Sequence, residues 1–183
     1  MIKELCAVLF ILCSPIIHNF DFTYDTQDEF VKGIMECTIN INAYLPPHSR
    51  VITIMSVAQA GLESGWGTSR FAREGNNFYG VIETNSDNPH MKSLRSNILL
   101  KKYGRKCESV ADYIYVLNKA SHFKEYRELR VKQVLVEEVD IDKTVDLLVP
   151  FAADNFYTYK IKDTIDYLFE NYPNLFGTRS TPL

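Results

Sequence analysis

Apolar residues recur at helical spacing over most of this chain of 183 residues. The first apolar stripe consists of Phe30, Ile34, Cys37, Ile41 and Leu45. These steps of three and four residues predict an amphipathic helix, which the Pro46-Pro47 pair ends.

A second apolar stripe has the same spacing and consists of Val51, Ile54, Met55, Ala58 and Leu62. It predicts a helix with Ser49 as its N-cap, ended by the glycines at positions 65 and 67. On this helix Ser56, Gln59 and Glu63 follow one another at steps of three and four. They therefore form a polar line beside the stripe.

The rest of the chain predicts one small β element and further helices. Residues 76–103 mix short aromatic or branched runs with Asn, Asp, Pro and Gly, which favours a β-hairpin with a mobile loop. Residues 109–135 predict two helices with a break near Ser121. Two more helices follow, divided by Pro150 and the cap signal Asp154-Asn155. The pattern predicts a single, mostly α domain of the α+β class.

The first 19 residues differ from the remainder. Lys3 precedes an apolar run from Leu5 to Cys13, which is too short for the roughly 30 Å hydrocarbon core of a bilayer. Such a run suits a secretory signal, so we expect an exported protein, periplasmic or associated with the cell envelope. Retention as a membrane anchor and a buried N-terminal helix are the alternatives. The chain is therefore divided into a signal or anchor segment, 1–19, and one domain, 20–183.

Composition narrows the classes of partner. Apolar residues make up 46% of the chain and charged residues 23%, which is typical of a globular protein. The net charge of −3 gives no electrostatic basis for binding nucleic acid or an anionic membrane surface. The histidines are scattered, so we expect neither a metal nor a cofactor. No sequence feature indicates an oligomer, and a monomer is expected.

Two cysteines lie beyond the N-terminal segment. Cys37 and Cys107 are far apart in the sequence, which does not reveal whether their Cα atoms come close enough to pair. We therefore interpret them as two small, buried hydrophobic residues.

Glu63 is the candidate catalytic residue. A carboxyl group on the flank of an apolar stripe, near the ring of Trp66, loses hydration when it ionises, so its pKa should rise. The negative end of the helix dipole acts in the same direction. A carboxyl that stays protonated near neutral pH can serve as a general acid, and Trp66 and Tyr79 could stack on sugar faces, as in lysozyme. The structural alternatives are a solvated Glu63 and a Trp66 in the core.

The segment from Ala58 to Gly80, AQAGLESGWGTSRFAREGNNFYG, resembles the central motif of bacterial glucosaminidases of glycoside hydrolase family 73, especially the Bax-like branch. In that family an Ala-rich helix leads into Leu-Glu-Ser-Gly-Trp-Gly and then into Ser-Arg-Phe-Ala-Arg-Glu-Gly-Asn-Asn. Three later segments, ESVADYIYVLN, HFKEYRELR and FAADNFYTYKIKDTI, also resemble segments of the family. The resemblance extends over residues 30–170.

This resemblance implies a lysozyme-like fold, with a helical lobe, a small β-hairpin lobe and a glycan-binding cleft between them. It implies hydrolysis of the β-1,4 bond after N-acetylglucosamine in the glycan strands of peptidoglycan, with Glu63 as the general acid. Asn77, together with Asn76, either holds the cleft wall or caps a turn. The other candidate substrate-binding residues are Trp66, Tyr79, Phe151 and Tyr157.

The second carboxylate of a glycosidase is less clearly marked in this sequence. Hydrolysing glycosidases usually place a base or nucleophile opposite the acid. The family often carries a Glu in its β-lobe hairpin, where this chain has Glu83 and Asp87. We take Glu83 as the second catalytic candidate, with a solvated loop residue as the alternative. If neither acid reaches the cleft, hydrolysis assisted by the 2-acetamido group and lytic transglycosylation both remain open.

Phe151 stands where the closing motif of most relatives has Tyr. Phe151 keeps the aromatic ring but lacks the hydroxyl group that could donate a hydrogen bond in the cleft. A hydrogen bond to a charged group contributes roughly 1.5–3 kcal/mol, so activity is expected to fall without being abolished. A catalytically weak relative that binds peptidoglycan is therefore a further alternative. Tyr157 matches the later Tyr of the motif, with a purely structural role as its alternative, and Asp154 is expected to cap the last helix.

Overall fold

The structure of the protein is a computed structural model that describes residues 20–94, 96–152 and 154–179. The predicted signal or anchor segment, 1–19, lies outside the described residues. In the described part of the chain, no helix is both long enough and apolar enough to cross a bilayer.

Helices dominate the described residues, and one two-stranded antiparallel sheet accompanies them. In chain order, with η for a 3-10 helix, the elements are α2 (Gln27–Ala43), η2 (Pro47–Ser49), α3 (Thr53–Ser64), α4 (Arg70–Gly75), β1 (His90–Lys92), β2 (Leu99–Lys101), α5 (Lys106–Lys119), η3 (Ser121–Phe123), α6 (Lys124–Val136), α7 (Ile141–Asp146), η4 (Val149–Phe151), α8 (Tyr157–Asn171) and α9 (Pro173–Phe176). This order confirms the predicted class, a mostly α fold with a small β-hairpin. It also confirms the break at residue 121, where η3 separates α5 from α6.

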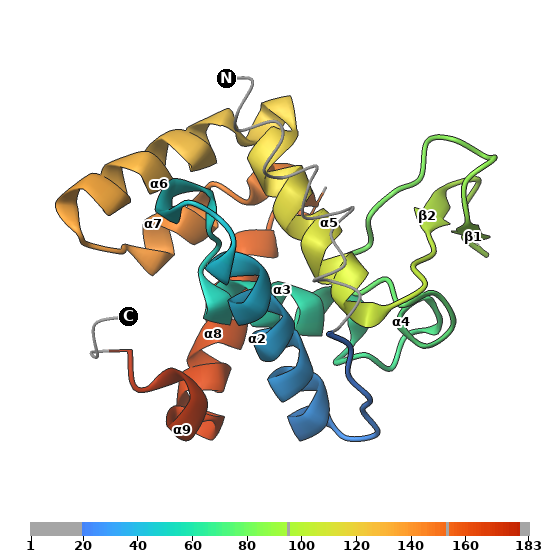
Figure 1. The fold of residues 1–183 in the computed structure, drawn as a ribbon, viewed down its shortest axis with the longest axis horizontal. Helices are drawn as coiled ribbons and strands as arrows, with labels where there is room; N and C mark the ends of the chain where they lie inside the picture. Colours follow the sequence, from blue (N-terminus) through green and yellow to red (C-terminus); the bar gives the residue numbers. More distant parts are fainter. Residues whose placement is uncertain (1–19, 95, 153, 180–183) are drawn as a thin grey trace.

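Helix α3 lies at the centre of the molecule and packs against both α2 and α8 (Figure 1). Small residues in the middle of α3, such as Ala58 and Ala60, are fully buried, and they let the neighbouring helices approach closely. At Gly61 a Cβ atom would lie 2.6 Å from the ring of Trp66, so glycine is required for this ring to fold back onto the helix. The central helix is thus held from several sides, and its C-terminal end has a fixed position.

Helix α2 begins with a reciprocal capping box. The hydroxyl of Thr26 accepts a hydrogen bond from Glu29 N at 3.3 Å, and the Glu29 carboxylate accepts one from Thr26 N at 3.0 Å. From this start the predicted apolar stripe, including Phe30 and Ile34, is buried against the rest of the core. The predicted amphipathic helix is therefore confirmed.

The predicted N-cap at Ser49 is wrong. Pro47 opens the short helix η2, which contains Ser49, and α3 begins only at Thr53 without a side-chain cap. The side chain of Asn42 holds this connection instead, since it donates to Val51 O at 2.8 Å and accepts from Val51 N at 3.1 Å. A proline at the start of a helical turn is favourable, which explains why the turn forms around Pro47.

The interpretation of the two cysteines as unpaired hydrophobic residues is also wrong. Cys37 on α2 and Cys107 on α5 form a disulfide, with their Cα atoms 5.4 Å apart. Both residues are buried, so the bridge joins the two helices inside the core. The two cysteines are 70 residues apart in the sequence, so local sequence patterns could not predict that they lie close together.

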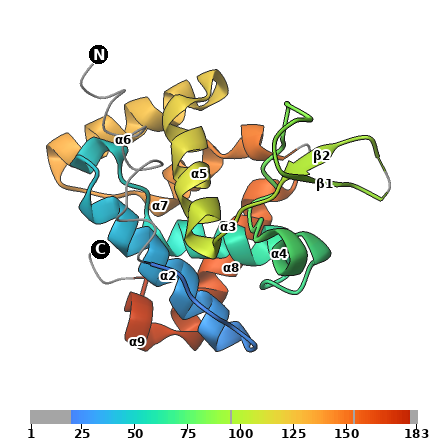
Figure 2. The same ribbon diagram turned by 45° about the vertical axis from the view of Figure 1, so that its right-hand side comes forward.

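The β-hairpin projects from the helical part beside α4, as Figure 2 shows. Its strands pair in the register His90–Lys101, Met91–Leu100 and Lys92–Leu99. A further isolated bridge joins Ile82 to Leu100, which ties the segment after α4 to the same edge. The hairpin predicted within residues 76–103 is confirmed.

Candidate active site

The candidate acid, Glu63, lies in the last turn of α3, and the way this helix ends fixes its position. Gly65 adopts the left-handed conformation with φ of 59°, as the predicted helix end requires. The hydroxyl of Ser64 donates to Ala60 O at 2.5 Å and accepts from Gly67 N at 2.8 Å. The chain after Glu63 is therefore turned sharply and held by hydrogen bonds within the buried interior.

Glu63 combines an exposed surface with a densely surrounded carboxyl group. Part of the side chain is open to solvent. Loss of hydration to neighbouring protein atoms nevertheless raises the pKa of Glu63 above its ordinary value of 4.5, while a hydrogen bond with Tyr157 opposes this shift. A Cβ atom at Gly80 would lie 3.9 Å from Glu63 Oε2, so the glycine leaves space beside the carboxylate. This environment favours the protonated form that a general acid needs.

A short chain of hydrogen bonds orients the hydroxyl group of Tyr157 toward Glu63. The Tyr113 hydroxyl donates to Gln59 Oε1, and Gln59 Nε2 donates to the Tyr157 oxygen at 2.8 Å. Because the Tyr157 oxygen accepts a hydrogen bond from Gln59, the hydroxyl hydrogen of Tyr157 is left to donate to the Glu63 carboxylate. Gln59 is fully buried one turn before Glu63, as the predicted polar line requires.

The first member of the predicted polar line, Ser56, belongs to a second buried network. Its hydroxyl is 2.9 Å from the Tyr79 hydroxyl and 3.0 Å from Thr38 Oγ1 on α2. The Tyr79 ring stacks on Tyr113 with centroids 4.1 Å apart and is only 1% exposed. The ring is enclosed by protein, so the sequence-based expectation that Tyr79 stacks on a sugar does not fit this placement.

Trp66 is placed between helices and has limited contact with solvent. Its ring lies across Phe30 with centroids 6.5 Å apart and beside Tyr167 with centroids 5.6 Å apart. These contacts give Trp66 a packing role at the junction of α2, α3 and α8. Its binding to substrate stays a prediction.

Phe151 packs against the residues that hold Glu63. Its ring is parallel to that of Tyr157 with centroids 6.3 Å apart, and it meets Tyr113 edge-on at 5.8 Å. The side chain is half-buried, so it supports Tyr157 from the side. A phenylalanine at this position adds no hydrogen-bond donor to the site.

Asn77 fastens the loop that leads into the hairpin. Its side-chain amide donates to Val81 O at 3.0 Å and Lys101 O at 2.9 Å, and its oxygen accepts from Val81 N at 3.1 Å. The side chain is buried, and Asn76 caps α4 in a left-handed conformation. These bonds match the turn-capping alternative for both residues.

Glu83, the second candidate acid, is bonded within its own loop. Its carboxylate accepts hydrogen bonds from Thr84 N and Asn85 N, both at 2.8 Å. These backbone bonds, with the Asn85 bond first, hold the pKa of Glu83 below its ordinary value, so the group is ionised at neutral pH. Asp87 lies farther along the loop and is exposed.

Asp154 caps the turn before α8 and does not cap the helix itself. Its carboxylate accepts from Phe156 N at 2.9 Å and pairs with Lys160 at 2.5 Å, whereas α8 begins at Tyr157 without a side-chain cap. The expectation that Asp154 is the N-cap of the last helix is therefore corrected. Its ion pair still fixes the approach of the chain to Tyr157.

Sequence reasoning missed Tyr113 as a member of the site. This residue is fully buried on α5, and its hydroxyl bond to Gln59 is formed across 54 positions of sequence. A single tyrosine within an apolar helix stripe carries no signal of such a bond. Glu63, Gln59 and Tyr157 are brought together, whereas Glu83 and Asn77 are bonded within the hairpin region.

Comparisons with known proteins agree with this architecture. A family model described as mannosyl-glycoprotein endo-beta-N-acetylglucosaminidase matches residues 47–170. The catalytic domain of the autolysin Auto from Listeria monocytogenes is similar in structure, with a TM-score of 0.58 and 22% identity over 84% of this chain and 87% of that chain. A peptidoglycan hydrolase from Sphingomonas sp. A1 has a TM-score of 0.61 and 16% identity over 85% of this chain and 97% of that chain. A comparison with curated proteins found no match.

Proposed function

Because this chain belongs to the glucosaminidase family of glycoside hydrolases, we propose that it cleaves the glycan strands of peptidoglycan with Glu63 as general acid. The observation that carries the proposal is the carboxyl group of Glu63, whose pKa is raised by desolvation and which has Tyr157 as its hydrogen-bond partner. The bond proposed for cleavage is the β-1,4 linkage after N-acetylglucosamine. Peptidoglycan as substrate is supported by the two similar structures, which are an autolysin catalytic domain and a peptidoglycan hydrolase.

In the proposed first step, protonated Glu63 transfers its proton to the glycosidic oxygen as the bond from that oxygen to the anomeric carbon breaks. The carboxylate that forms is stabilised by the hydrogen bond from Tyr157, which favours the charged form of Glu63. The electron deficiency at the anomeric carbon is then relieved by water, which loses a proton to a base. Tyr157 therefore acts through Glu63, as a positioning residue.

Glu83 is the proposed base, because its backbone hydrogen bonds keep it ionised at neutral pH. The same bonds support a second candidate function. A carboxylate engaged with its own loop leaves Glu63 to act alone, and a single carboxyl can serve first as acid and then as base. In that case the muramoyl hydroxyl attacks in place of water, and the enzyme is a lytic transglycosylase.

The Cys37–Cys107 disulfide supports action outside the cytoplasm. Disulfides persist mainly in oxidising compartments such as the periplasm and the cell surface. Export is also what a substrate in the cell wall requires. We therefore retain the prediction that residues 1–19 direct the chain out of the cytoplasm.

Mass spectrometry of the fragments released from purified peptidoglycan tests the proposal. Fragments that end in reducing N-acetylglucosamine are expected from the wild-type protein. Anhydromuramoyl ends would instead assign the transglycosylase function, and binding without soluble fragments would identify a catalytically weak relative. The Glu83→Gln variant separates the mechanisms, since loss of hydrolysis with a folded protein assigns Glu83 as base, and retained hydrolysis removes it from that role.

A further inference from the structure

Asp112 on α5 is a buried carboxylate that holds one end of the β-hairpin. It is 6% exposed and accepts two hydrogen bonds at 2.7 Å, one from Lys101 Nζ and one from the Tyr103 hydroxyl. Lys101 is the last residue of β2, and Tyr103 follows it by two positions. Burial, together with the charge of Asp112, raises the pKa of Tyr103, so this hydroxyl keeps its proton and remains a donor. The end of the hairpin is therefore fastened to α5 by a charged pair and a hydroxyl group.

The contact between Lys101 and Asp112 defines an orientation more than it adds stability. Loss of hydration offsets much of the attraction when a charged pair is buried, so such pairs contribute little net free energy of folding. The side chains of Lys101 and Asp112 are 31% and 9% exposed. Their contact of 2.7 Å forms only where β2 lies close to α5, so the pair sets the position of this strand on the helical part.

Strand β2 also holds the segment that carries Glu83. Glu83 N donates to Leu99 O, and Lys101 N donates to Val81 O, both at 2.9 Å. These two bonds flank the antiparallel bridge between the segments. Residues that face each other across antiparallel strands share one face of the sheet, and so do residues two positions apart on one strand. Glu83 therefore lies on the same face as Lys101, as its diagonal neighbour, which is within reach of a long side chain.

Lys101 thus lies between the buried carboxylate on α5 and the carboxylate of Glu83. The pKa of Glu83 is lowered first by the hydrogen bond from Asn85 N and, more weakly, by the positive charge of Lys101. Further titratable side chains on or against this face of the sheet are His90, Lys92, Tyr103, Glu108 and Asp112.

Consecutive residues of α5 serve both candidate carboxylates. Asp112 holds the strand beside the proposed base. The next residue, Tyr113, donates to Gln59, whose amide donates to Tyr157, the hydrogen-bond partner of Glu63. A single turn of α5 therefore supports the acid from one side and the segment of the base from the other.

We propose that Lys101 and Asp112 are positioning residues for Glu83, which hold its segment against α5 and so fix its carboxylate relative to the acid. This inference rests on the proposed function, in which Glu83 is the base. Neither residue needs to touch the substrate, since both act through Glu83. Loss of either should impair the base and leave the acid as it is.

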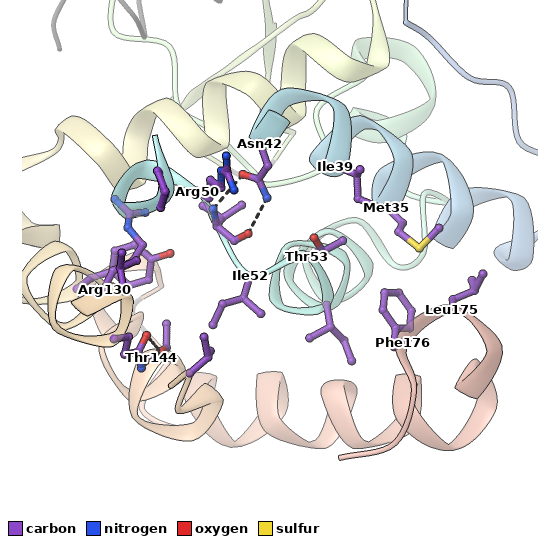
Figure 3. A pocket seen from close by; sticks show the side chains of 17 residues that line it. Met35, Ile39, Asn42, Arg50, Ile52, Thr53, Arg130, Thr144, Leu175 and Phe176 are labelled. Atoms are coloured by element: carbon purple, nitrogen blue, oxygen red, sulfur yellow. Dashed lines mark hydrogen bonds between the residues drawn. The ribbon is translucent and has the colours of Figure 1, made fainter. Parts of the chain in front are cut away.

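Amide hydrogen exchange of the full chain, followed residue by residue by NMR, tests the positioning without substrate. Asp112→Asn keeps the shape of the side chain and removes its charge, so the amides of Glu83 and Lys101 should exchange about tenfold faster than in wild type. The amide of Val51 donates to Asn42 Oδ1 at 3.1 Å beside a pocket at the other end of α3 (Figure 3). It is the internal reference, and its exchange should be unchanged.

Lys101→Met removes the other partner from its more exposed side and should give the same exchange pattern. It is the second test of the pair if Asp112→Asn loses its fold. Unchanged exchange at the amide of Glu83 in the folded variants would overturn the proposal.

The pH dependence of fragment release from peptidoglycan tests the link to the base. Without the charge of Lys101, the pKa of Glu83 should rise, so the acidic limb of the pH–rate profile of Lys101→Met should move to higher pH. The alkaline limb, which reports Glu63, should stay where it is. Lys102→Met is the matched control, because it removes the same charge from the next residue, which is exposed, and it should move neither limb. An acidic limb of Lys101→Met equal to that of Lys102→Met would overturn the proposal.

Turnover by the double variant shows whether the pair acts as a unit. Lys101→Met and Asp112→Asn should each lower the turnover number by about tenfold, and the double variant should lose no more than the single variants. Losses that multiply would contradict a shared role. Failure of the proposed function has a different signature: Glu83→Gln then retains hydrolysis, while the exchange pattern still decides whether Lys101 and Asp112 hold this segment.

Discussion

The Tyr157→Phe substitution removes the one hydroxyl group that both contacts Glu63 and accepts from Gln59. In the proposed reaction this hydroxyl stabilises the carboxylate that Glu63 becomes when it releases its proton. A hydrogen bond to a charged group contributes about 1.5–3 kcal/mol, which corresponds to a turnover number roughly tenfold to 150-fold lower. The aromatic ring is kept, so packing against Phe151 should be unchanged.

The same substitution should move the pH dependence in a defined direction. The Tyr157 hydrogen bond lowers the pKa of Glu63 against the effect of burial, so its removal raises that pKa further. The alkaline limb of the pH–rate profile reports loss of the proton from the acid and should therefore shift to higher pH. A variant with altered packing alone would lower turnover without this shift.

The assay is the release of soluble fragments from purified peptidoglycan as a function of pH. Tyr159→Phe is the matched control, because it removes the same atom from a residue on the same helix that is 67% exposed. Chemical unfolding shows how far the loss of a partner for the buried amide of Gln59 destabilises the fold. A turnover number and alkaline limb equal to those of Tyr159→Phe would refute the role given to Tyr157.

Phe151→Tyr places a hydroxyl beside the ring that holds the acid and should raise turnover on peptidoglycan several-fold; an unchanged rate would contradict the view that this position limits activity. Glu63→Gln should raise the free energy of unfolding at neutral pH, because the folded-state pKa of Glu63 is raised: its contribution to stability is fully present below its ordinary value of 4.5 and is lost as pH rises through the folded value. Denaturant unfolding should therefore show the gain shrinking as pH falls, and a gain independent of pH would refute it. Replacing Cys37 and Cys107 by Ala should lower the free energy of unfolding by about 2–4 kcal/mol, since the bridge closes a loop of 70 residues; calorimetric melting that shows no decrease would count against a formed disulfide.

The spacing of residues along the sequence was sufficient to predict the central helix and the polar line on it. Gln59 and Glu63 lie one turn apart, and helical periodicity alone places them on one flank of α3. The apolar stripe and Trp66 beside Glu63 also predicted that its carboxyl group would lose hydration, which agrees with the upward shift of its pKa.

The hydrogen bonds and the disulfide that complete this arrangement join residues far apart in the sequence. Local periodicity contains no information about such contacts. Tyr157 is 98 positions from Gln59, and Cys37 is 70 positions from its disulfide partner. The aromatic residues show the same limit, because the burial of Tyr79 depends on its stacking against Tyr113 on another helix. The local turn pattern gave a wrong prediction at Ser49. Pro47 starts a 3-10 turn that contains Ser49, so this residue does not cap the following helix.

The central claim is that Glu63 donates the proton that breaks the glycan strand. Its most direct test is the rate of fragment release from peptidoglycan by Glu63→Gln, compared with wild type and with Glu74→Gln. Glu74 is exposed on α4. Among the ion pairs of the described residues, its only partner is Arg70, at 3.7 Å. This variant therefore controls for the loss of a carboxylate outside the candidate site. We expect no release by folded Glu63→Gln and normal release by Glu74→Gln. Fragment release by Glu63→Gln at the wild-type rate would contradict it.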